Sequence, residues 1–106
     1  MGITVVNITV AQNGGILSPA DLPALCDRVR KAVSDQALQG LVVLSGRLPV
    51  WAFAALAHTF HPAAGVATFD PRLGGGVVVQ THSPAYKVGD VVALDGKDAQ
   101  TVDVTY

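Results

Sequence analysis

Four side chains of this sequence are of types that could act together on a phosphate group or a metal ion. Asp70 and Arg72 lie two residues apart in the segment DPRLGGG, and His61 and His82 lie on either side of it along the chain. A carboxylate with one or two imidazoles could hold Mn²⁺, because this ion accepts oxygen and nitrogen ligands. An arginine could stabilise the charge that develops on a phosphate during cleavage. If a metal binds here, water or phosphate must complete its coordination, which is the open form expected in catalysis.

Ordinary structural roles could account for part of this set. A turn alone explains Asp70 and Pro71, because aspartate starts tight turns and proline fixes their second position, but it does not explain Arg72. His61 comes directly before a proline, so it is expected where a helix ends and could simply interact with the helix C-terminus. His58 follows an apolar run and could be a core residue.

A second candidate site is the segment Ser45-Gly46-Arg47, between an apolar run and an alanine-rich segment. Gly46 would let a ligand approach the backbone closely, Ser45 offers a hydroxyl, and the guanidinium of Arg47 suits a phosphate. N–H groups at the start of a following helix would favour an anion. The alternative is a plain strand-to-helix turn with Arg47 in solvent, which is common in α/β folds.

Two segments between the apolar runs predict helices. SPADLPALCDRVRKAV (residues 18–33), with either Ser18 or Asp21 as its N-cap, places a set of apolar residues on one face at helical spacing: Leu22, Leu25, Cys26, Val29 and Val33. LPVWAFAALAHTF (residues 48–60) is rich in alanine and too long for a strand, so it predicts a mostly buried helix that begins near Pro49.

The remaining apolar segments predict strands at residues 3–10, 40–46, 65–69, 77–81, 90–94 and 100–106. The second of these is continuously apolar, as expected for a strand buried on both faces. Asp95-Gly96 predicts a hairpin between the last two. By strand alternation, Val78, Gln80 and His82 are expected to share one face.

This order of elements predicts an α/β fold, with one domain over residues 1–106 and a mixed sheet flanked by helices. In such sheets, ligands bind where strands end and helices begin. Nothing in the sequence resembles a serine triad, a P-loop or a GxGxxG fingerprint. The glycine run Gly74 to Gly76 precedes a predicted strand, whereas a phosphate-binding glycine loop precedes a helix.

Composition limits the partners and the location. Half of the residues are apolar and 14% are charged, against about 25% in typical domains, so we expect an apolar surface covered by a second copy in a homodimer. The net charge of −1 disfavours long nucleic acid. Cys26 is the only cysteine, which excludes an internal disulfide. The N-terminus lacks a basic leader and the apolar run Leu48–Ala57 is too short to span a bilayer, so we expect a cytoplasmic protein without membrane contact.

Together these residues resemble a known family. The segment from Leu44 to Ser83 resembles the third ring-nuclease family, small accessory proteins of type III CRISPR systems. The elements that carry the resemblance are Ser45-Gly46-Arg47 with Pro49 and Trp51, His58 and His61, Asp70-Pro71-Arg72-Leu73-Gly74, and Gln80 with His82. Relative to the family pattern, Gly75 and Gly76 are expected to lengthen the turn after Asp70.

The resemblance implies a CRISPR-associated Rossmann-like fold and a manganese-dependent phosphodiesterase. Such proteins form homodimers and degrade cyclic tetra-adenylate, a second messenger that activates defence nucleases. The resemblance also implies that dimers stack head to tail around the ring, so that different dimers supply the binding and cleaving groups. By position, Ser45, Gly46, Arg47 and Gln80 would bind the ligand. The cleavage site would contain His61, Asp70, Arg72 and His82, with His61, Asp70 and His82 as metal ligands.

Three other functions fit parts of the sequence. A sensor would bind the messenger without cutting it, and an exonuclease would shorten linear RNA from its 3′ end in a metal-dependent reaction. An oligomeric α/β domain without any nucleotide role would need none of the polar residues singled out above. The full set of histidines, aspartate and arginine favours an enzyme, and the near-neutral charge disfavours long RNA.

Overall fold

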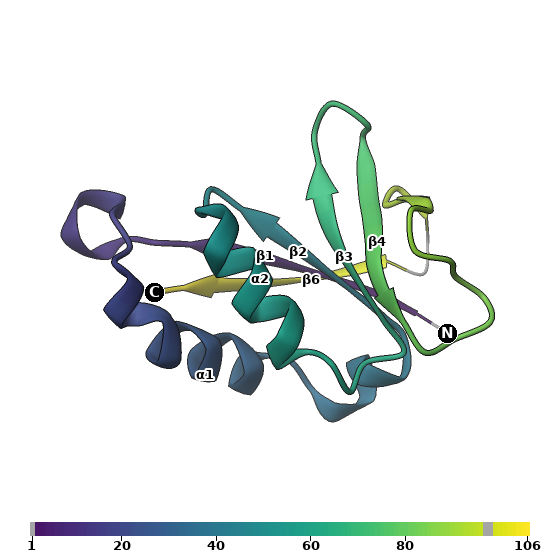
Figure 1. Cartoon of the computed structure of the whole chain (residues 1–106), viewed down its shortest axis with the longest axis horizontal. Coiled ribbons are helices and arrows are strands. Elements are labelled where there is room, and N and C mark those ends of the chain that lie inside the picture. The colour runs from purple at the N-terminus through teal and green to yellow at the C-terminus, as the bar shows by residue number, and fades with distance from the viewer. Residues whose placement is uncertain (1, 97–98) are drawn as a thin grey trace.

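A computed structural model describes residues 2–96 and 99–106. Six strands form one sheet in the order β5-β4-β3-β2-β1-β6 (Figure 1). In chain order the elements are β1 (Ile3–Thr9), the 3₁₀ helices η1 (Gln12–Gly15) and η2 (Pro19–Asp21), α1 (Leu22–Ala32), the 3₁₀ helix η3 (Asp35–Gln39), β2 (Leu41–Gly46), α2 (Val50–Thr59), β3 (Gly65–Asp70), β4 (Gly75–Thr81), β5 (Val91–Ala93) and β6 (Ala99–Thr105).

The predicted α/β fold with a mixed sheet is confirmed. Strands β1, β2, β3 and β6 run parallel, and β4 and β5 extend the sheet in antiparallel orientation. The parallel strands therefore share one edge at their carboxyl ends and one edge at their amino ends. The carboxyl end of β4 lies at the amino edge, because β4 runs opposite to β3.

Both predicted N-cap residues, Ser18 and Asp21, take part in the start of the first helical segment. Ser18 and Asp21 form a capping box around η2, in which the Asp21 carboxylate accepts hydrogen bonds from the backbone N–H and hydroxyl of Ser18 (2.9 and 3.2 Å). The α-helix follows directly from Leu22. Leu25 and Val29 are fully buried, as the helical spacing predicted.

Helix α2 is buried along one stripe only, so the prediction of a mostly buried helix was wrong. Ala52 and Leu56 have no exposed surface, whereas Val50 is 84% exposed and Ala54 and His58 are exposed. A single layer of sheet lies beneath the helix and nothing covers its other side among the described residues, so the high alanine content does not imply complete burial.

Both helices pack on the same face of the sheet (Figure 1). There Val6, Ile8, Val42, Leu44 and Val66 of the strands meet the buried residues of α1 and α2. The opposite face has a smaller core, in which the fully buried Leu41 and Val43 pack with Ala67 and Val78. The segment after β4 covers this face with Tyr86, Val92 and Leu94.

The predicted hairpin around Asp95-Gly96 was wrong. β5 pairs with β4, and β6 pairs in parallel with β1 at the other edge of the sheet. The Asp-Gly signal reports local turn preference, but the two strands have different partners because each completes a different edge. Residues 97–98 lie outside the described part of the chain.

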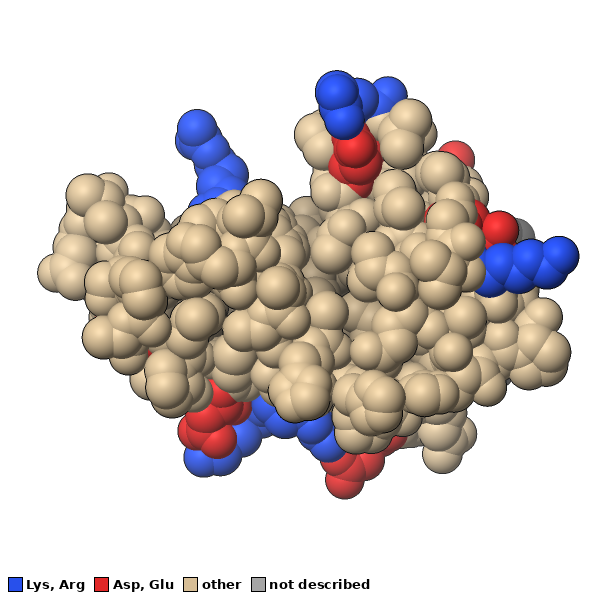
Figure 2. Space-filling view, in the orientation of Figure 1, with Lys and Arg blue, Asp and Glu red and all other residues tan. Residues whose placement is uncertain are grey.

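Few charged groups interrupt the surface seen in Figure 2, in accord with the composition. No helix among the described residues combines the length and apolar character that crossing a bilayer requires.

Candidate functional site

The carboxyl edge of the sheet presents Ser45, Gly46 and Arg47 at the end of β2. Gly46 has a φ of 147°, and a Cβ there would collide with the backbone carbonyl of Ile8. Close packing against β1 therefore requires this glycine whether or not a ligand approaches it. Arg47 is exposed and makes no hydrogen bond or ion pair with any described residue.

Arg47 lines a cavity of about 490 Å³ with Ile8, Thr9, Val10, Gly14 and Gly15. Asn13, Gly14 and Gly15 all have positive φ, so they form a left-handed loop over the end of β1. The sequence marks this glycine pair only as a turn. Its position after the first strand of an α/β unit was the available signal that it borders a ligand cavity.

Asp70 and Arg72 lie at the same carboxyl edge, in the turn between β3 and β4. An oxygen of the Asp70 carboxylate accepts the Arg72 backbone N–H at 2.8 Å, and the other lies 3.4 Å from the guanidinium. Hydrogen bonds from the Arg72 side chain and then its backbone lower the pKa of Asp70, with a smaller Coulombic contribution. The carboxylate therefore remains ionised, and the Arg72 side chain, 88% exposed, could reach an anion.

Gly75 and Gly76 belong to β4, so the expectation that they lengthen the turn was wrong. The turn closes at Gly74, which has a φ of 68° and donates its N–H to the Asp70 carbonyl. A Cβ on Gly75 would lie 2.6 Å from the Val92 carbonyl, and one on Gly76 would lie 3.1 Å from Val43. Both glycines are needed because β5 and the second core approach the strand closely.

His61 and His82 meet at the opposite, amino edge of the sheet. Their ring centroids are 4.8 Å apart and the rings are nearly perpendicular, at 88°. Gln80 joins them: its amide nitrogen donates to the backbone carbonyl of His61 at 3.2 Å. The backbone N–H of His82 donates to Ala64, at the entry to β3, at 2.8 Å. His58 is exposed and is not a core residue.

A β-bulge places Gln80 on the helix-covered face of the sheet. β4 pairs Val78 with Ala67 but Gln80 with Val66, so Val79 is an extra residue without a partner on β3. Val78 packs in the second core, whereas Gln80 bonds to the chain that leaves α2. The expectation that Val78 shares a face with Gln80 was therefore wrong, since one extra residue reverses the alternation.

The structure does not bring the predicted metal ligands together within one chain. Asp70 ends β3, whereas His61 and His82 lie beside its start, and five residue steps along a strand span about 17 Å. Across residues 2–96 and 99–106, no three His, Cys, Asp or Glu side chains are close enough to hold one ion. The set of His61, Asp70 and His82 therefore does not fit Mn²⁺ within one copy.

The fold and these positions define a small α/β protein with exposed arginines at one sheet edge and a histidine pair at the other. Residues 10–93 match the family described as CRISPR-associated protein (Cas_csx3), and the chain belongs to this family. An uncharacterized protein of Aquifex aeolicus (strain VF5) is 51% identical over 65 residues, which cover 61% of this chain and 59% of that relative. The match thus spans about three fifths of the relative's length.

Proposed function

We propose that this protein is a ring nuclease, a phosphodiesterase that opens cyclic tetra-adenylate and so ends type III CRISPR antiviral signalling in the cytoplasm. Family membership supports a role in CRISPR defence. The observation that carries the enzymatic part is the distribution of polar groups over two edges. Arginines and an ionised carboxylate lie at one edge, and two adjacent imidazoles lie at the other.

Two copies stacked head to tail would unite these groups. The carboxyl edge of one copy, with Arg47, Asp70 and Arg72, would face the amino edge of the next, with His61 and His82. A cyclic tetranucleotide between them would meet guanidinium groups on one side and imidazoles on the other. This arrangement is heterologous, so it permits continued stacking of homodimers. Mn²⁺ could be held by the predicted ligands only across two such copies.

The arginines and the imidazoles have separate roles in this proposal. Arg47 and Arg72 bind phosphate oxygens, and Arg72 also stabilises the charge that grows in the transition state. The imidazoles at the other edge supply the acid and base, or nitrogen ligands for a metal. The product end identifies the nucleophile. Attack by water leaves a plain phosphate, and attack by a ribose 2′-hydroxyl leaves a 2′,3′-cyclic phosphate.

The first test is cleavage of labelled cyclic tetra-adenylate with and without manganese by the wild type, His61→Ala and Asp70→Ala. We expect manganese-dependent cleavage by the wild type and loss of cleavage in both variants. Tight binding without cleavage would support the sensor instead, a function that the separation of the two clusters within one chain favours. Normal cleavage by Asp70→Ala would contradict the site assignment.

A mixing experiment tests whether the site is shared between copies. His61→Ala and Asp70→Ala are each expected to be inactive, but together they regain about one quarter of wild-type activity if each site takes one residue from each of two randomly mixed copies. The control is a mixture of His61→Ala with His82→Ala, which restores nothing because both changes affect the same edge. A wild-type specific activity that stays constant on dilution would contradict a shared site.

A further inference from the structure

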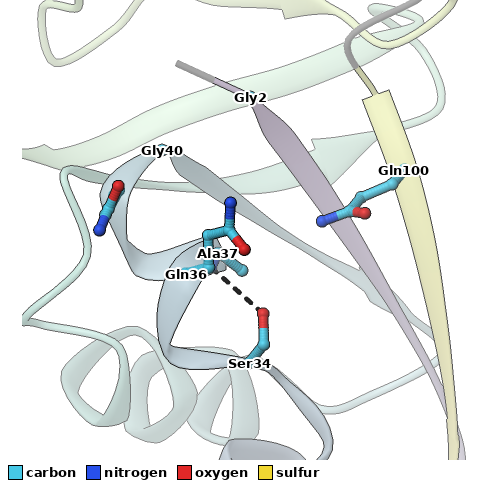
Figure 3. Close-up of a pocket in the computed structure, with 7 residues that line it drawn as sticks. Gly2, Ser34, Gln36, Ala37, Gly40 and Gln100 are labelled. Atoms are coloured by element: carbon cyan, nitrogen blue, oxygen red, sulfur yellow. Dashed lines mark hydrogen bonds between the residues drawn. The ribbon is translucent and has the colours of Figure 1, made fainter.

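A second cavity opens at the amino edge of the sheet, the edge that carries the histidine pair. Its volume is about 530 Å³, within the range of small-ligand sites. Residues from three separate parts of the chain line it, among them Gly2, Ser34, Gln36, Gln39, Gly40 and Gln100. Figure 3 shows the amides of Gln36 and Gln100 extending from η3 and β6 into the space between them.

The lining suits a neutral group with both donors and acceptors. Three of the residues that line the cavity are glutamines, and no lining residue carries a charge. The amide nitrogen of Gln100 donates to the hydroxyl of the buried Thr4 at 3.0 Å, which fixes its orientation. Gln36 and Gln39 make no side-chain hydrogen bond within the described part of the chain, so their amides remain available. A primary amide can pair with the N6 and N7 edge of adenine.

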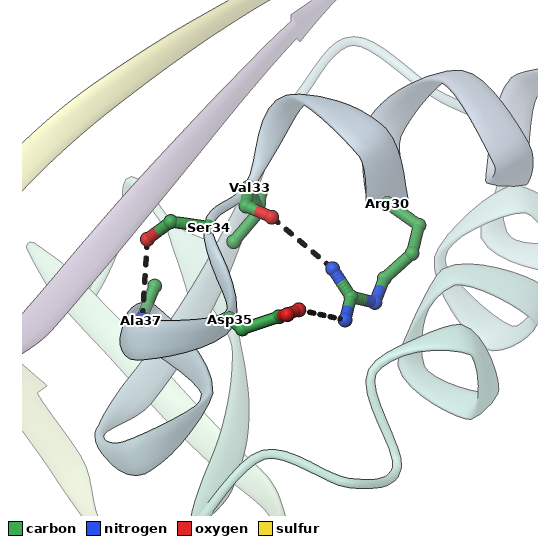
Figure 4. A network of polar contacts seen from close by, with 5 residues as sticks. All are labelled: Arg30, Val33, Ser34, Asp35 and Ala37. Atoms are coloured by element: carbon green, nitrogen blue, oxygen red, sulfur yellow. Dashed lines mark hydrogen bonds and ion pairs between the residues drawn. The ribbon is translucent and has the colours of Figure 1, made fainter.

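The floor of the cavity is held in place by local contacts. The Ser34 hydroxyl accepts the backbone N–H of Ala37 at 3.3 Å and caps η3, while Arg30 pairs with Asp35 at 2.8 Å and donates to the Val33 carbonyl at 3.1 Å (Figure 4). These contacts fix the 3₁₀ helix that carries two of the three glutamines. The amides are therefore presented by a defined backbone.

The cavity lies close to the histidine pair along the same edge. Ala64 donates its N–H to the Leu38 carbonyl at 2.9 Å and accepts the His82 N–H at 2.8 Å. Ala64 thus bridges Leu38 of η3 and His82, so the η3 side of the cavity lies about two strand spacings, roughly 10 Å, from His82. Gln100, on β6, lies two strands further along the same edge. A phosphodiester at the histidines and a base in the cavity can therefore belong to one small nucleic acid.

From this juxtaposition we propose that the amide-lined cavity is a base subsite that receives an adenine of the ring while a phosphodiester lies at His61 and His82. The inference rests on the proposed function for the identity of the base. It adds a specificity element: the amides read the base edge, and the arginines of the other edge hold phosphates without reading sequence.

The test uses the nucleoside alone, so it does not depend on ring cleavage. The ¹⁵N-labelled protein is titrated with adenosine, uridine and ribose 5-phosphate, and the side-chain amide signals of the three glutamines are followed by NMR. Adenosine is expected to shift these signals saturably, and uridine and ribose 5-phosphate are expected to shift them far less. Gln36→Leu and Gln100→Leu should each weaken adenosine binding about tenfold.

Gln12→Leu is the matched control, because Gln12 lies at the other end of the sheet with its amide near Asp21. Gln36→Leu carries the test if Gln100→Leu fails to fold, since Gln36 is exposed. Two results would overturn the subsite but not the ring nuclease. In a protein that cleaves the ring, adenosine could leave the glutamine amide signals unchanged, or ribose 5-phosphate could shift them as much as adenosine does. Adenosine binding without cleavage would support the subsite and contradict the ring nuclease.

Discussion

The imidazole of His82 meets that of His61 edge-on, with ring centroids 4.8 Å apart, although the two residues come from different elements. His61 follows α2, and His82 follows β4. The amide of Gln80 connects them by donating to the His61 carbonyl. The mutual position of the rings therefore depends on the β-bulge at Val79, which places Gln80 on this face.

Replacement of Gln80 by leucine is expected to impair catalysis more than stability. The loss of one hydrogen bond should lower the free energy of unfolding by about 1 kcal/mol. Displacement of His61 should reduce kcat for ring cleavage by about 10- to 100-fold. Single-turnover cleavage and urea unfolding measure the two effects. Gln12→Leu serves as the control, and a variant with unchanged kcat would mean that Gln80 has only a structural role.

The close packing around Gly76 predicts how substitutions there change stability. In Gly76→Ala the new methyl group would lie 3.1 Å from the Val43 Cγ1 and 3.3 Å from the Ala67 Cβ, which should lower stability by about 1–3 kcal/mol. Adding Val43→Ala should relieve part of the overlap, so the effects of the two substitutions should not be additive in thermal unfolding.

Gly74→Ala is the matched comparison for that experiment. A Cβ at this position meets nothing within 4 Å, but the φ of 68° is left-handed, so the expected cost is about 1 kcal/mol from backbone strain. Val43→Ala should not rescue this variant. Rescue of both variants, or of neither, would contradict the close packing of Gly76 against the second core.

The pKa of Asp70 provides a test of the turn at the carboxyl edge. Arg72→Ala should raise this pKa toward its ordinary range, because the largest cause of its lowering is the hydrogen bond from the Arg72 side chain. The shift should be partial, since the backbone N–H of residue 72 still donates to the carboxylate. Carboxyl ¹³C NMR measures it directly, and an unchanged pKa would mean that the guanidinium does not contact Asp70 in solution.

The lowered pKa of Asp70 also makes the stability of the fold depend on pH. A carboxyl whose pKa is lower when folded stabilises the fold above its unfolded pKa, and this contribution is lost as pH falls through the folded value. The stability difference between wild type and Asp70→Asn should therefore be constant above about pH 5 and diminish below about pH 4. Urea unfolding of both proteins across this pH range measures the stability difference. A difference that grew as the pH fell would contradict the lowered pKa of Asp70.

Arg47 is expected to contribute to binding rather than to folding. It is exposed and pairs with no described residue, so Arg47→Ala should leave thermal unfolding unchanged. The Kd for cyclic tetra-adenylate should rise at least about tenfold, and its dependence on salt should weaken. Lys31→Ala is the control, because Lys31 forms an exposed pair with Asp27 on α1. Equal effects of the two substitutions would contradict a specific role for Arg47.

Local patterns in the sequence predicted most of the elements and the residues of the candidate sites. β-branched runs predicted strands, helical spacing predicted the buried Leu25 and Val29, and the continuous apolar run predicted the burial of Leu41–Leu44 in β2. These features depend on neighbouring residues, whose periods of 2 and 3.6 are visible in one sequence. The family resemblance likewise rested on short ordered motifs, and its CRISPR-associated part is confirmed.

The distribution of those residues over the molecule was decided by tertiary structure alone. Whether β6 pairs with β5 or β1 depends on which edges remain free, and the face that Gln80 occupies depends on one bulged residue. The amide cavity is lined by residues from both ends of the chain, Gly2 and Gln100, so no local sequence pattern could predict it. Composition and spacing determined which groups this protein has. The fold separated them: α2 brings His61 to the start of β3, Asp70 lies at the end of β3, and the antiparallel β4 returns His82 to the starting edge. Asp70 and the two histidines therefore lie at opposite edges, because a strand separates its ends by its own length.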